Sequence, residues 1–588
     1  MIKWLGAQWW RHLDRVGPVG QPLGDSETQT DWWRHAVIYQ ILPWSFLDTT
    51  QTGIGDLQGI IQKLDYVQSL GVDAIWLTPI YESPMEDMGY DITDMLDIDP
   101  LFGEMGDFEK LVDIAHGYGL KVLIDQVWNH TSDQHPWFVE SRKSRDNPKA
   151  DWYVWADPKA DGSPPNNWLS AFMGGSAWHW DTRRQQYFLA NFLPSQPELN
   201  WYNEAVVQAV LNLARFWLDK GVDGFRIDAV NFFLHDAQLR NNPVREPNMS
   251  LPDGIASDNP MVKQLFTNSF CRAETFEKLK PIRTLLDRYP QVVSLGEVTL
   301  CEDSVELSGQ YVAGSDRLHL VYNSALLQNQ PLTAELLKNV MTRIQTHFPQ
   351  GGQCWMVGNH DYGRLRSRWT HMDREGQPYP DEFYHMMVAL LLSLPGALCL
   401  YQGDELGLSE AKIPKDIPIH KIRDAFGKAL YPVIPGRDGS RTPMPWQANV
   451  LHCGFTQAEE PWLPIPRKHR RLAVDVQTMD PNSLLNTWRK LLHWRKLQPA
   501  LLGGDFHMLE TTEPVFAFIR STATQKMLCL FNTGRYRIPF SFQTCGLPLE
   551  QLQPILGLGY QDWEHHDEFI TLPPYSGLFA NFSPSVKA

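Results

Sequence analysis

Residues 204–228, EAVVQAVLNLARFWLDKGVDGFRID, decide the fold. Glu204–Lys220 has the length and the apolar spacing of an amphipathic helix. After a short turn, Gly224–Asp228 is a brief apolar run of strand length that ends in a charged residue. A helix joined in this way to a buried strand is a unit of a parallel sheet with helices on its outside. The stretch therefore predicts an α/β protein.

The same alternation extends from residue 35 to about residue 400. The strand-like runs are Ala36–Tyr39, Ala74–Leu77, Val122–Asp125, Gly224–Asp228, Val292–Gly296, Leu318–Tyr322, Trp355–Val357 and Ala397–Tyr401. The helix-length segments are Gly59–Leu70, Asp107–His116, Glu204–Lys220, Lys278–Arg288, Ala334–Thr346 and Glu382–Leu394. Eight buried strands that alternate with helices predict a closed (β/α)₈ TIM barrel.

Three parts of the chain depart from this alternation. A Trp-, Pro- and Gly-rich interval follows the third strand, and Gly407–Trp446 is a long insertion after the eighth. After Leu501 short alternating runs predict antiparallel strands. We predict an N-terminal extension (1–30), a barrel (31–130 and 201–500), an inserted subdomain (131–200) and a C-terminal β-sandwich (501–588).

Composition narrows the class of partner. The net charge is −16, which disfavours nucleic acid and anionic membranes as partners. No apolar stretch is long enough to cross a membrane, and the first twenty residues do not resemble a signal peptide. The seven cysteines form no zinc-like spacing, so free thiols in the cytoplasm are expected. Both a monomer and a homodimer are compatible with the sequence.

Charged side chains gather where the predicted strands end. They are His130 after the third strand, Arg226 and Asp228 on the fourth, Glu297 on the fifth, and His360 and Asp361 on the seventh, taken as Val357–Asp361. Any one of these carboxylates could cap a helix or form a structural ion pair. Since strand ends of a barrel converge on one rim, which carries the catalytic groups of such enzymes, the set predicts an active site.

The motifs DQVWNH, GFRIDAVNF, GEV and NHD resemble, in order and spacing, the four signature regions of the α-amylase superfamily, glycoside hydrolase family 13. QPELN (Gln196–Asn200), GDELG and DGSRTPMPW (Asp438–Trp446) resemble motifs of its α-glucosidase and oligo-1,6-glucosidase branch. The first of these has Glu198 where the branch usually has Asp. The likeness covers about residues 31–450.

The resemblance implies a retaining hydrolase that needs no cofactor for its chemistry. Such an enzyme uses two carboxyl groups about 5–5.5 Å apart. Asp228 is then the nucleophile, kept ionised by Arg226, and Glu297 is the acid/base, with a pKa raised by burial and by the charge of Asp361. The resemblance gives Asp361 the task of gripping the sugar ring. His130 and His360 would donate hydrogen bonds to sugar hydroxyls.

A closed pocket is also implied. In this branch an Asp, here Asp87, pairs with an Arg, here Arg441, behind the terminal glucose, and Tyr90 stacks on the sugar. Phe172 and Phe192 resemble the aromatic lids of the same pocket, with core packing as the alternative. A pocket closed in this way permits only exo attack. Ala229, where 1,6-specific relatives usually have Val, favours short α-1,4-linked substrates.

One loop resembles a structural Ca²⁺ or Mg²⁺ site. Its residues are Asp48, Thr50, Thr52, Ile54 and Asp56, but relatives have Asn and Asp where the two threonines stand. Loss of one carboxylate and one amide weakens a site for a hard cation. The sequence leaves both a metal-free loop and weak binding of the ion open.

Two other functions share much of the pattern. A transglucosylase, an isomerase such as trehalose synthase, or a sucrose-active enzyme would use the same catalytic residues. A non-enzymatic partner protein of the same family would have lost those residues and would carry a membrane span. Analysis of the products formed from maltose and sucrose separates hydrolysis from transfer.

Overall fold

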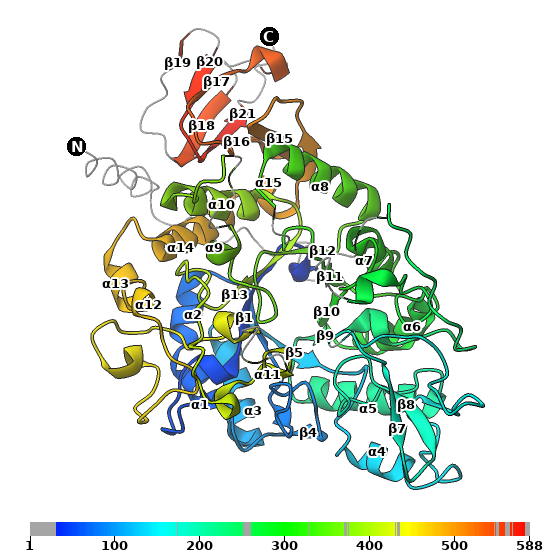
Figure 1. The fold of residues 1–588 in the computed structure, drawn as a ribbon. Helices are drawn as coiled ribbons and strands as arrows, with labels where there is room; N and C mark the ends of the chain where they lie inside the picture. The colour runs from blue at the N-terminus through cyan, green and yellow to red at the C-terminus, as the bar shows by residue number, and fades with distance from the viewer. Residues whose placement is uncertain are drawn as a thin grey trace.

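Eight parallel strands close into a barrel at the centre of the molecule, as predicted (Figure 1). The computed structural model describes residues 31–582 apart from 173, 250, 252–259, 328–329, 370–372, 374, 430, 432–435, 546, 548–551, 559–564 and 567–568. The strands are β1 (Val37–Ile41), β2 (Ala74–Leu77), β5 (Lys121–Gln126), β9 (Gly224–Ile227), β10 (Val293–Glu297), β11 (Leu320–Tyr322), β12 (Gln353–Met356) and β13 (Ala397–Tyr401). The predicted N-terminal extension, 1–30, lies outside the described residues.

Strand ends differ from the prediction by one or two residues at most positions, and the largest difference concerns β12. That strand ends at Met356, so His360 and Asp361 lie in the loop that follows it rather than on the strand itself. The side chain of Asn359 explains the early end, because its Oδ1 accepts the backbone N–H groups of Asp361 (2.8 Å) and Tyr362 (3.0 Å). An Asx-type turn replaces the hydrogen bonds between strands at this point.

The helix before β9 illustrates how the sequence builds one barrel unit. Asn203 caps α5 (Glu204–Asp219) by accepting the N–H of Ala205, which satisfies one unpaired donor of the first turn. The helix buries its apolar stripe, which consists of Val206, Val207, Val210, Leu213, Ala214, Trp217 and Leu218. Gly221, at φ +89°, turns the chain back toward β9 in a conformation that favours glycine.

All six predicted helical segments are present among the helices of the barrel and its rim. The helices are α1 (Leu57–Gln62), α2 (Leu64–Leu70), α3 (Met105–Gly117), α5, α6 (Thr275–Leu286), α7 (Ser304–Val312), α8 (Ala334–His347), α9 (Leu365–Arg368), α10 (Asp381–Ser393), α11 (Ala425–Ala429), α12 (Arg467–Arg470), α13 (Val474–Met479), α14 (Leu484–Arg495) and α15 (Pro499–Gly503). The predicted helix Gly59–Leu70 is two helices that meet at Lys63, and the helices α7, α9 and α11 to α15 were not predicted.

Two small sheets stand on the barrel. A hairpin of β3 (Tyr81–Glu82) and β4 (Asp94–Ile98) follows β2. Between β5 and α5 the chain forms α4 (Pro136–Ser141) and a three-stranded antiparallel sheet of β6 (Trp155–Ala156), β8 (Gln186–Leu189) and β7 (Trp178–Asp181). This part is cyan to green and lies at the lower right of Figure 1.

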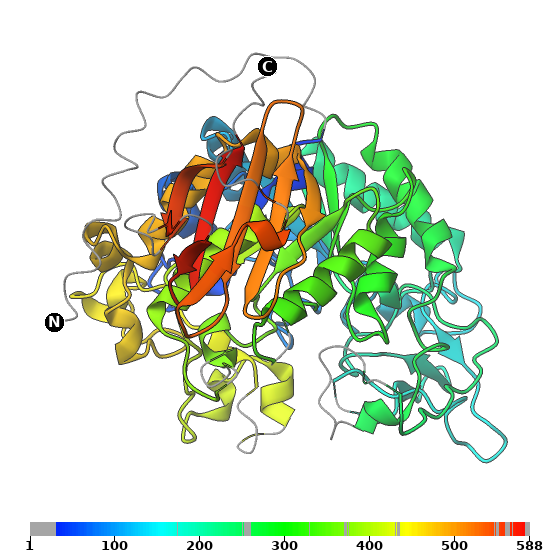
Figure 2. The ribbon, with the colours of Figure 1, turned by 90° about the horizontal axis from the view of Figure 1, so that it is seen from above.

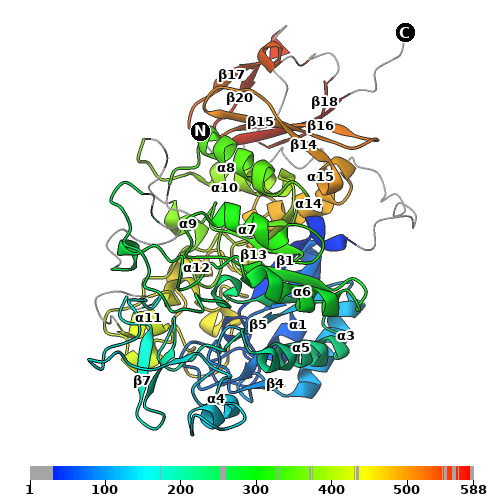
Figure 3. The same cartoon turned by 90° about the vertical axis from the view of Figure 1, so that its right-hand side faces the viewer.

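The C-terminal part consists of two antiparallel sheets. One has the order β14 (Asp505–Met508), β15 (Val515–Ser521), β16 (Lys526–Asn532), β21 (Ser576–Phe582), β18 (Leu552–Leu558), and the other β17 (Ile538–Ser541), β20 (Phe569–Leu572), β19 (His565–His566). Inward side chains of the two sheets share one apolar cluster. Figures 2 and 3 show this part stacked on the barrel beside α8 and α10, at the side away from the inserted sheet.

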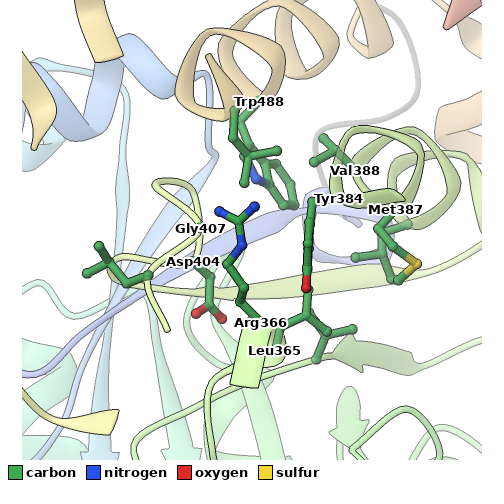
Figure 4. Close-up of a pocket in the computed structure, with 12 residues that line it drawn as sticks. Leu365, Arg366, Tyr384, Met387, Val388, Asp404, Gly407 and Trp488 are labelled. Carbon is green, nitrogen blue, oxygen red and sulfur yellow. The ribbon is translucent and has the colours of Figure 1, made fainter. Parts of the chain in front are cut away.

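A small cavity lies between α10, α14 and the loop after β13 (Figure 4). Arg366 packs over the ring of Tyr384, with its guanidinium carbon 4.5 Å from the ring centre. Trp488 and the carboxylate of Asp404 complete much of the lining. None of the candidate site residues predicted from sequence lines this cavity. In the part of the chain that the structure describes, no helix combines the length and the hydropathy that a membrane crossing requires.

Candidate active site

Four carboxylates meet at the carboxyl ends of neighbouring strands. Asp125 lies near the end of β5, Asp228 follows β9 directly, Glu297 ends β10, and Asp361 lies in the loop after β12. These strands are neighbours in the barrel order β12-β11-β10-β9-β5. Asp228 and Glu297 keep about a tenth of their side-chain surface accessible, and Asp361 about a quarter, whereas the side chain of Asp125 is fully buried.

The guanidinium of Arg226 joins three of the four carboxylates. Its Nη1 donates to Asp125 at 2.8 Å and to Asp228 at 2.6 Å. Its Nη2 donates to Glu297 at 2.5 Å and to the hydroxyl of Tyr322 at 2.6 Å. The planar fork of an arginine suits this task, because it presents several donors at fixed angles. Alternation along β9 places Arg226 and Asp228 on the same side of the strand, as the sequence predicts.

Each of the two central carboxylates keeps one oxygen that takes no hydrogen bond from any described residue. Arg226 donates only to Oδ1 of Asp228, and Arg226 together with the backbone N–H of Ala229 (3.2 Å) donates only to Oε2 of Glu297. Ala229 adopts a left-handed backbone at φ +43°, unusual for a residue with a side chain. In this conformation the backbone N–H of Ala229 faces Glu297, so a strained backbone conformation is found at the site.

Burial raises the pKa of both Asp228 and Glu297 to about 7, against the opposing effect of Arg226. Asp125 and Asp361 add negative charge that raises the pKa of Asp228, while Asp228 and Asp361 do the same for Glu297. Removing one proton from the pair hinders removal of the second, so the two groups titrate together. At neutral pH the pair can therefore hold one proton, the state that acid catalysis beside an ionised nucleophile requires.

Asp361 is the ionised member of the set. Burial alone would raise its pKa, but contacts with His360, Arg437 and Arg441 outweigh burial and hold the pKa well below its usual range. Its Oδ1 accepts from Arg437 at 2.6 Å and from Arg441 at 3.2 Å. Burial lowers the pKa of His360 itself to about 3, so at neutral pH the two arginines are the charged partners that keep Asp361 ionised.

Tyr90, His360 and His130 form one wall of the site. The hydroxyl of Tyr90 contacts Nε2 of His360 at 2.7 Å and donates to Asp125 at 2.9 Å. The rings of Tyr90 and His360 are stacked, with centroids 5.4 Å apart and an interplanar angle of 2°. Nε2 of His130 lies 3.1 Å from the carbonyl oxygen of Tyr90. Burial lowers the pKa of His130 to about 4, so this ring is also neutral and can donate or accept a hydrogen bond.

The predicted ion pair between Asp87 and Arg441 is not formed. The described partner of Asp87 is Arg437, at 3.5 Å, and Gln196 also donates to Asp87 at 3.1 Å. Arg441 instead donates to the carbonyl oxygen of His360 at 2.7 Å and approaches Met88 and Asp361. Both arginines lie at the site four residues apart, and the resemblance of the motif did not tell which of them reaches Asp87.

The two aromatic residues predicted as lids lie next to each other. The rings of Phe172 and Phe192 are 5.4 Å apart. Phe172 lies under the guanidinium of Arg437 at 5.2 Å, and Phe192 lies 5.2 Å from the ring of His130. Phe192 also packs on Phe232, which belongs to an apolar cluster beside Ala229. The structure thus brings both phenylalanines to the site. Phe192 contacts both a site residue, His130, and the apolar cluster.

The loop predicted as a possible metal site is held by its own hydrogen bonds. Asp48 accepts the backbone N–H groups of Thr50 (2.9 Å) and Gly53 (2.7 Å), and Asp56 accepts those of Thr49 and Gly59, each at 2.7 Å. The hydroxyls of Thr50 and Thr52 also point to loop oxygens, among them the carbonyl of Ile54. With threonine at two of the five positions, the loop offers two carboxylates, which is fewer anionic ligands than a Ca²⁺ or Mg²⁺ ion usually takes, and both already accept bonds from the loop.

Four residues of the site were not predicted from the sequence: Asp125, Tyr322, Arg437 and Asp424. The first two lie on β5 and β11 and contact Arg226, whereas the last two lie in the insertion after β13. A signal existed for Asp125, which lies at a predicted strand end within DQVWNH. The same signal existed for Tyr322, which ends the predicted strand Leu318–Tyr322. Nothing in local spacing marked Asp424, because it acts through a contact distant in sequence.

Comparison with known proteins agrees with this site. Residues 40–504 match the family model described as alpha amylase, catalytic domain. The chain is 44% identical over 557 residues to a probable alpha-glucosidase of Rhizobium meliloti, covering 95% of this chain and 98% of the relative. It is 34% identical to an oligo-1,6-glucosidase of Heyndrickxia coagulans, covering 87% and 94% of the two chains.

A similar solved structure is that of the alpha-glucosyl transfer enzyme XgtA. It shares 46% identity with this chain at a TM-score of 0.87, covering 94% of this chain and 100% of its own. An isomaltulose synthase mutant from Erwinia rhapontici, solved with sucrose, has 28% identity and a TM-score of 0.79. Hydrolases and transferases are therefore both represented among similar chains.

Proposed function

The chain belongs to the alpha-amylase family of glycoside hydrolases, and on that basis we propose that it is an exo-acting, retaining α-glucosidase. Its substrates would be short oligosaccharides or small glucosides with a terminal, non-reducing α-linked glucose. The observation that carries the proposal is the contact of one guanidinium with two carboxylates, since Arg226 donates to both Asp228 and Glu297.

The proposed reaction is a double displacement. The free oxygen of Asp228 attacks the anomeric carbon while Glu297 gives its proton to the departing glycosidic oxygen. The C–O bond to the leaving sugar breaks as the bond to Asp228 forms. Glu297, now ionised, takes a proton from water, whose oxygen attacks the same carbon and releases Asp228. Two inversions return an α-configured glucose. No cofactor takes part in these steps.

Arg226 and Asp361 support the charge changes in this reaction. Arg226 remains bonded to both catalytic carboxylates as negative charge moves from Asp228 to Glu297. The ionised Asp361 favours positive charge that develops on the sugar ring in the oxocarbenium-like transition state. His130, His360 and Tyr90 are proposed to contact the hydroxyls and the face of that ring.

The exo mode rests on the closed end of the pocket. Asp87, Arg437 and Arg441 lie together there, and Asp361 accepts from both arginines. Burial raises the pKa of Asp87 against the influence of the two arginines. A sugar chain cannot continue through this group of charged side chains, so only a terminal glucose would fit. The α-1,4 preference rests on Ala229 and on no other residue.

Time-resolved proton NMR on maltose, isomaltose and sucrose tests the proposal. The expected result is early release of α-glucose from the non-reducing end, before mutarotation, with maltose consumed faster than isomaltose. Early β-glucose would mean inversion and would exclude the double displacement. Faster use of isomaltose would overturn the inference from Ala229.

Transfer of glucose is the second candidate function, and one observation favours it. The chain is 46% identical to the alpha-glucosyl transfer enzyme XgtA. Trehalose, longer oligosaccharides or glucosides of added alcohols in the same NMR experiment would support transfer.

Three further expectations complete the proposal. We propose that the loop Asp48–Asp56 is held by hydrogen bonds rather than by a divalent ion. None of the seven cysteines, all within the described residues, forms a disulfide, which supports a reducing compartment such as the cytoplasm. The non-enzymatic alternative is disfavoured because the chain keeps Asp228, Glu297 and Asp361 together at one site.

A further inference from the structure

Arg437 connects the closed end of the pocket with its catalytic side. Its Nη1 donates to Asp361 at 2.6 Å, and its Nη2 lies 3.5 Å from Asp87. The same guanidinium lies over the ring of Phe172. An arginine side chain has many rotamers, so holding it in one position costs conformational entropy. A contact within the protein is therefore needed to hold the Arg437 side chain in place before the sugar binds.

Asp424 is the group that fixes it. Its Oδ1 accepts from Nε of Arg437 at 2.7 Å and from Nη2 at 2.6 Å, and its Oδ2 accepts the backbone N–H groups of Arg437 (2.7 Å) and Gly427 (3.0 Å). The side chain of Asp424 is fully buried. Burial would raise its pKa, but the charges of Arg437 and Arg441 outweigh burial and hold the pKa below its ordinary value. Asp424 is thus an ionised, fully bonded carboxylate.

The backbone around this pair forms a reciprocal clasp, which we define as residues 423–424 and 437–438. The side chain of Asp424 accepts the backbone N–H of Arg437, and the side chain of Asp438 accepts those of Arg423 (3.0 Å) and Asp424 (3.1 Å). Gly436 passes so close that a Cβ there would lie 2.3 Å from Oδ2 of Asp424, at φ +66°. Both carboxylates of the clasp are buried, so water cannot replace these bonds without opening it.

We propose that Asp424 is a positioning residue that holds Arg437 against Asp87 and Asp361 and so sets the closed end of the glucose pocket. Asp424 has no described hydrogen bond to Asp87, Asp361 or either catalytic carboxylate, so it acts through Arg437. This role deepens the proposed exo function and rests on it. It predicts that recognition of the far side of the terminal glucose, where its 4-hydroxyl lies, depends on Asp424.

A substrate comparison tests the role. The wild type and D424N are assayed with p-nitrophenyl α-glucoside and with its 4-deoxy analogue. In the wild type, loss of the 4-hydroxyl should lower kcat/KM at least about tenfold, because buried polar groups lose their partner. In D424N, KM for the parent glucoside should rise about tenfold, and the penalty for the 4-deoxy analogue should shrink to about threefold or less.

Two controls separate positioning from general damage. D416N changes an exposed acid of the same insertion and should keep the kinetics of the wild type. R437M should also lose discrimination against the 4-deoxy analogue, and adding D424N to R437M should change it no further, since the two residues form one unit. D424E, which keeps the charge, should restore part of the discrimination. If D424N does not fold, D438N removes the other carboxylate of the clasp. It should also lower the ratio of kcat/KM for the parent glucoside to kcat/KM for the 4-deoxy analogue.

Three outcomes overturn the inference. Discrimination in D424N equal to that of the wild type would show that Arg437 does not need Asp424. If D424N lowered discrimination against the 4-deoxy analogue as much in R437M as it does in the wild type, Asp424 would act independently of Arg437. A wild type that releases terminal glucose but does not discriminate against the 4-deoxy analogue would remove the recognition role, whereas a wild type that releases no terminal glucose would contradict the exo function itself.

Discussion

Nη2 of Arg226 donates a hydrogen bond to Oε2 of Glu297 at 2.5 Å, which assigns the two oxygens of that carboxyl different tasks. A guanidinium carries no lone pair to accept a proton, so the oxygen facing Arg226 is the one that stays unprotonated. The acidic proton of Glu297 then belongs on Oε1, the oxygen without a described protein partner. Arg226 therefore orients the acid/base group as well as holding Asp228.

Azide distinguishes the roles of the two carboxylates. E297A should hydrolyse maltose very poorly, yet azide should speed its reaction with an activated aryl glucoside and give α-glucosyl azide, because azide attacks an intermediate on Asp228 and needs no base. D228A should give β-glucosyl azide, since azide then replaces the nucleophile. The anomeric proton signals of the two products identify them.

The control for this pair is D361A, which removes a third carboxylate of the site. It should lose activity without forming either azide, because Asp361 is neither nucleophile nor acid. Formation of the same anomer by E297A and D228A would contradict the assignment of Asp228 and Glu297.

The variant R226K should move the acid limb of the pH profile. Lysine keeps the charge but cannot donate to several carboxylates in the fork geometry of Arg226. With weaker hydrogen bonds the pKa of Asp228 rises further, so ionisation of the nucleophile needs a higher pH. We expect kcat/KM to fall about a hundredfold or more and its acid limb to shift upward, measured from pH 5 to 9.

The matched control is R240K, which changes an exposed arginine that pairs with the buried carboxylate of Asp236. It should leave both the rate and the pH profile unchanged. An acid limb of R226K at the wild-type pH would mean that Arg226 does not set the ionisation of Asp228.

Glu198 should make stability depend on pH. Burial raises its pKa to about 7, and its hydrogen-bonding partners are the amides of Asn191 and Asn129 rather than a cation. A carboxyl whose folded pKa lies above its unfolded value of about 4.5 holds a proton that the unfolded chain releases, so stability falls as pH rises from about 4.5 to 7. The full loss is about 3 kcal/mol.

The variant E198Q cannot ionise and should remove this dependence. Its Tm should decline less than that of the wild type between pH 5 and pH 8, measured by differential scanning fluorimetry. E510Q changes an exposed glutamate and should follow the wild-type curve. Parallel curves for E198Q and the wild type would show that Glu198 is not the protonated group.

Removal of divalent ions should leave the protein unchanged. Because loop donors already satisfy Asp48 and Asp56, EDTA should alter the Tm by less than about 1 °C, and millimolar Ca²⁺ or Mg²⁺ should add no more. D48N should lower the Tm to the same extent with or without these ions, since it weakens the bonds to Thr50 and Gly53. A clear rise of the wild-type Tm with either ion would show that the loop binds it.

Much of the barrel could be predicted because each strand is a short apolar run bounded by turns, and four strands end near charged residues. This regularity marked Asp228, Glu297 and Arg226 as candidates, and the family resemblance supplied their roles. Helix α7 was not predicted, although Asp303 caps it by accepting the N–H of Glu306. Strands β14 and β18 were also missed, since β14 is short and β18 contains Pro554 and Gly557.

The closed end of the pocket could not be predicted in the same way. Arg437 and Arg441 have the same chemistry and lie four residues apart, so only the fold of the insertion decides which of them faces Asp87. The role of Asp424 could not be predicted for a related reason, because its partner Arg437 lies 13 positions further along the chain. In the loop Asp48–Asp56, the two aspartates shared with relatives suggested a cation. In the structure their carboxylates accept backbone N–H groups of the loop.

The clasp at residues 423–424 and 437–438 has a consequence for protein engineering. Bonds of the clasp fix Asp424 and Arg437, the two residues that bound the segment 425–436. Exchange of residues 428–435 for a stretch of another length, with Gly427 and Gly436 kept, should therefore leave Arg437 in place. The clasp thus marks a position at which the insertion can be varied separately from recognition of glucose.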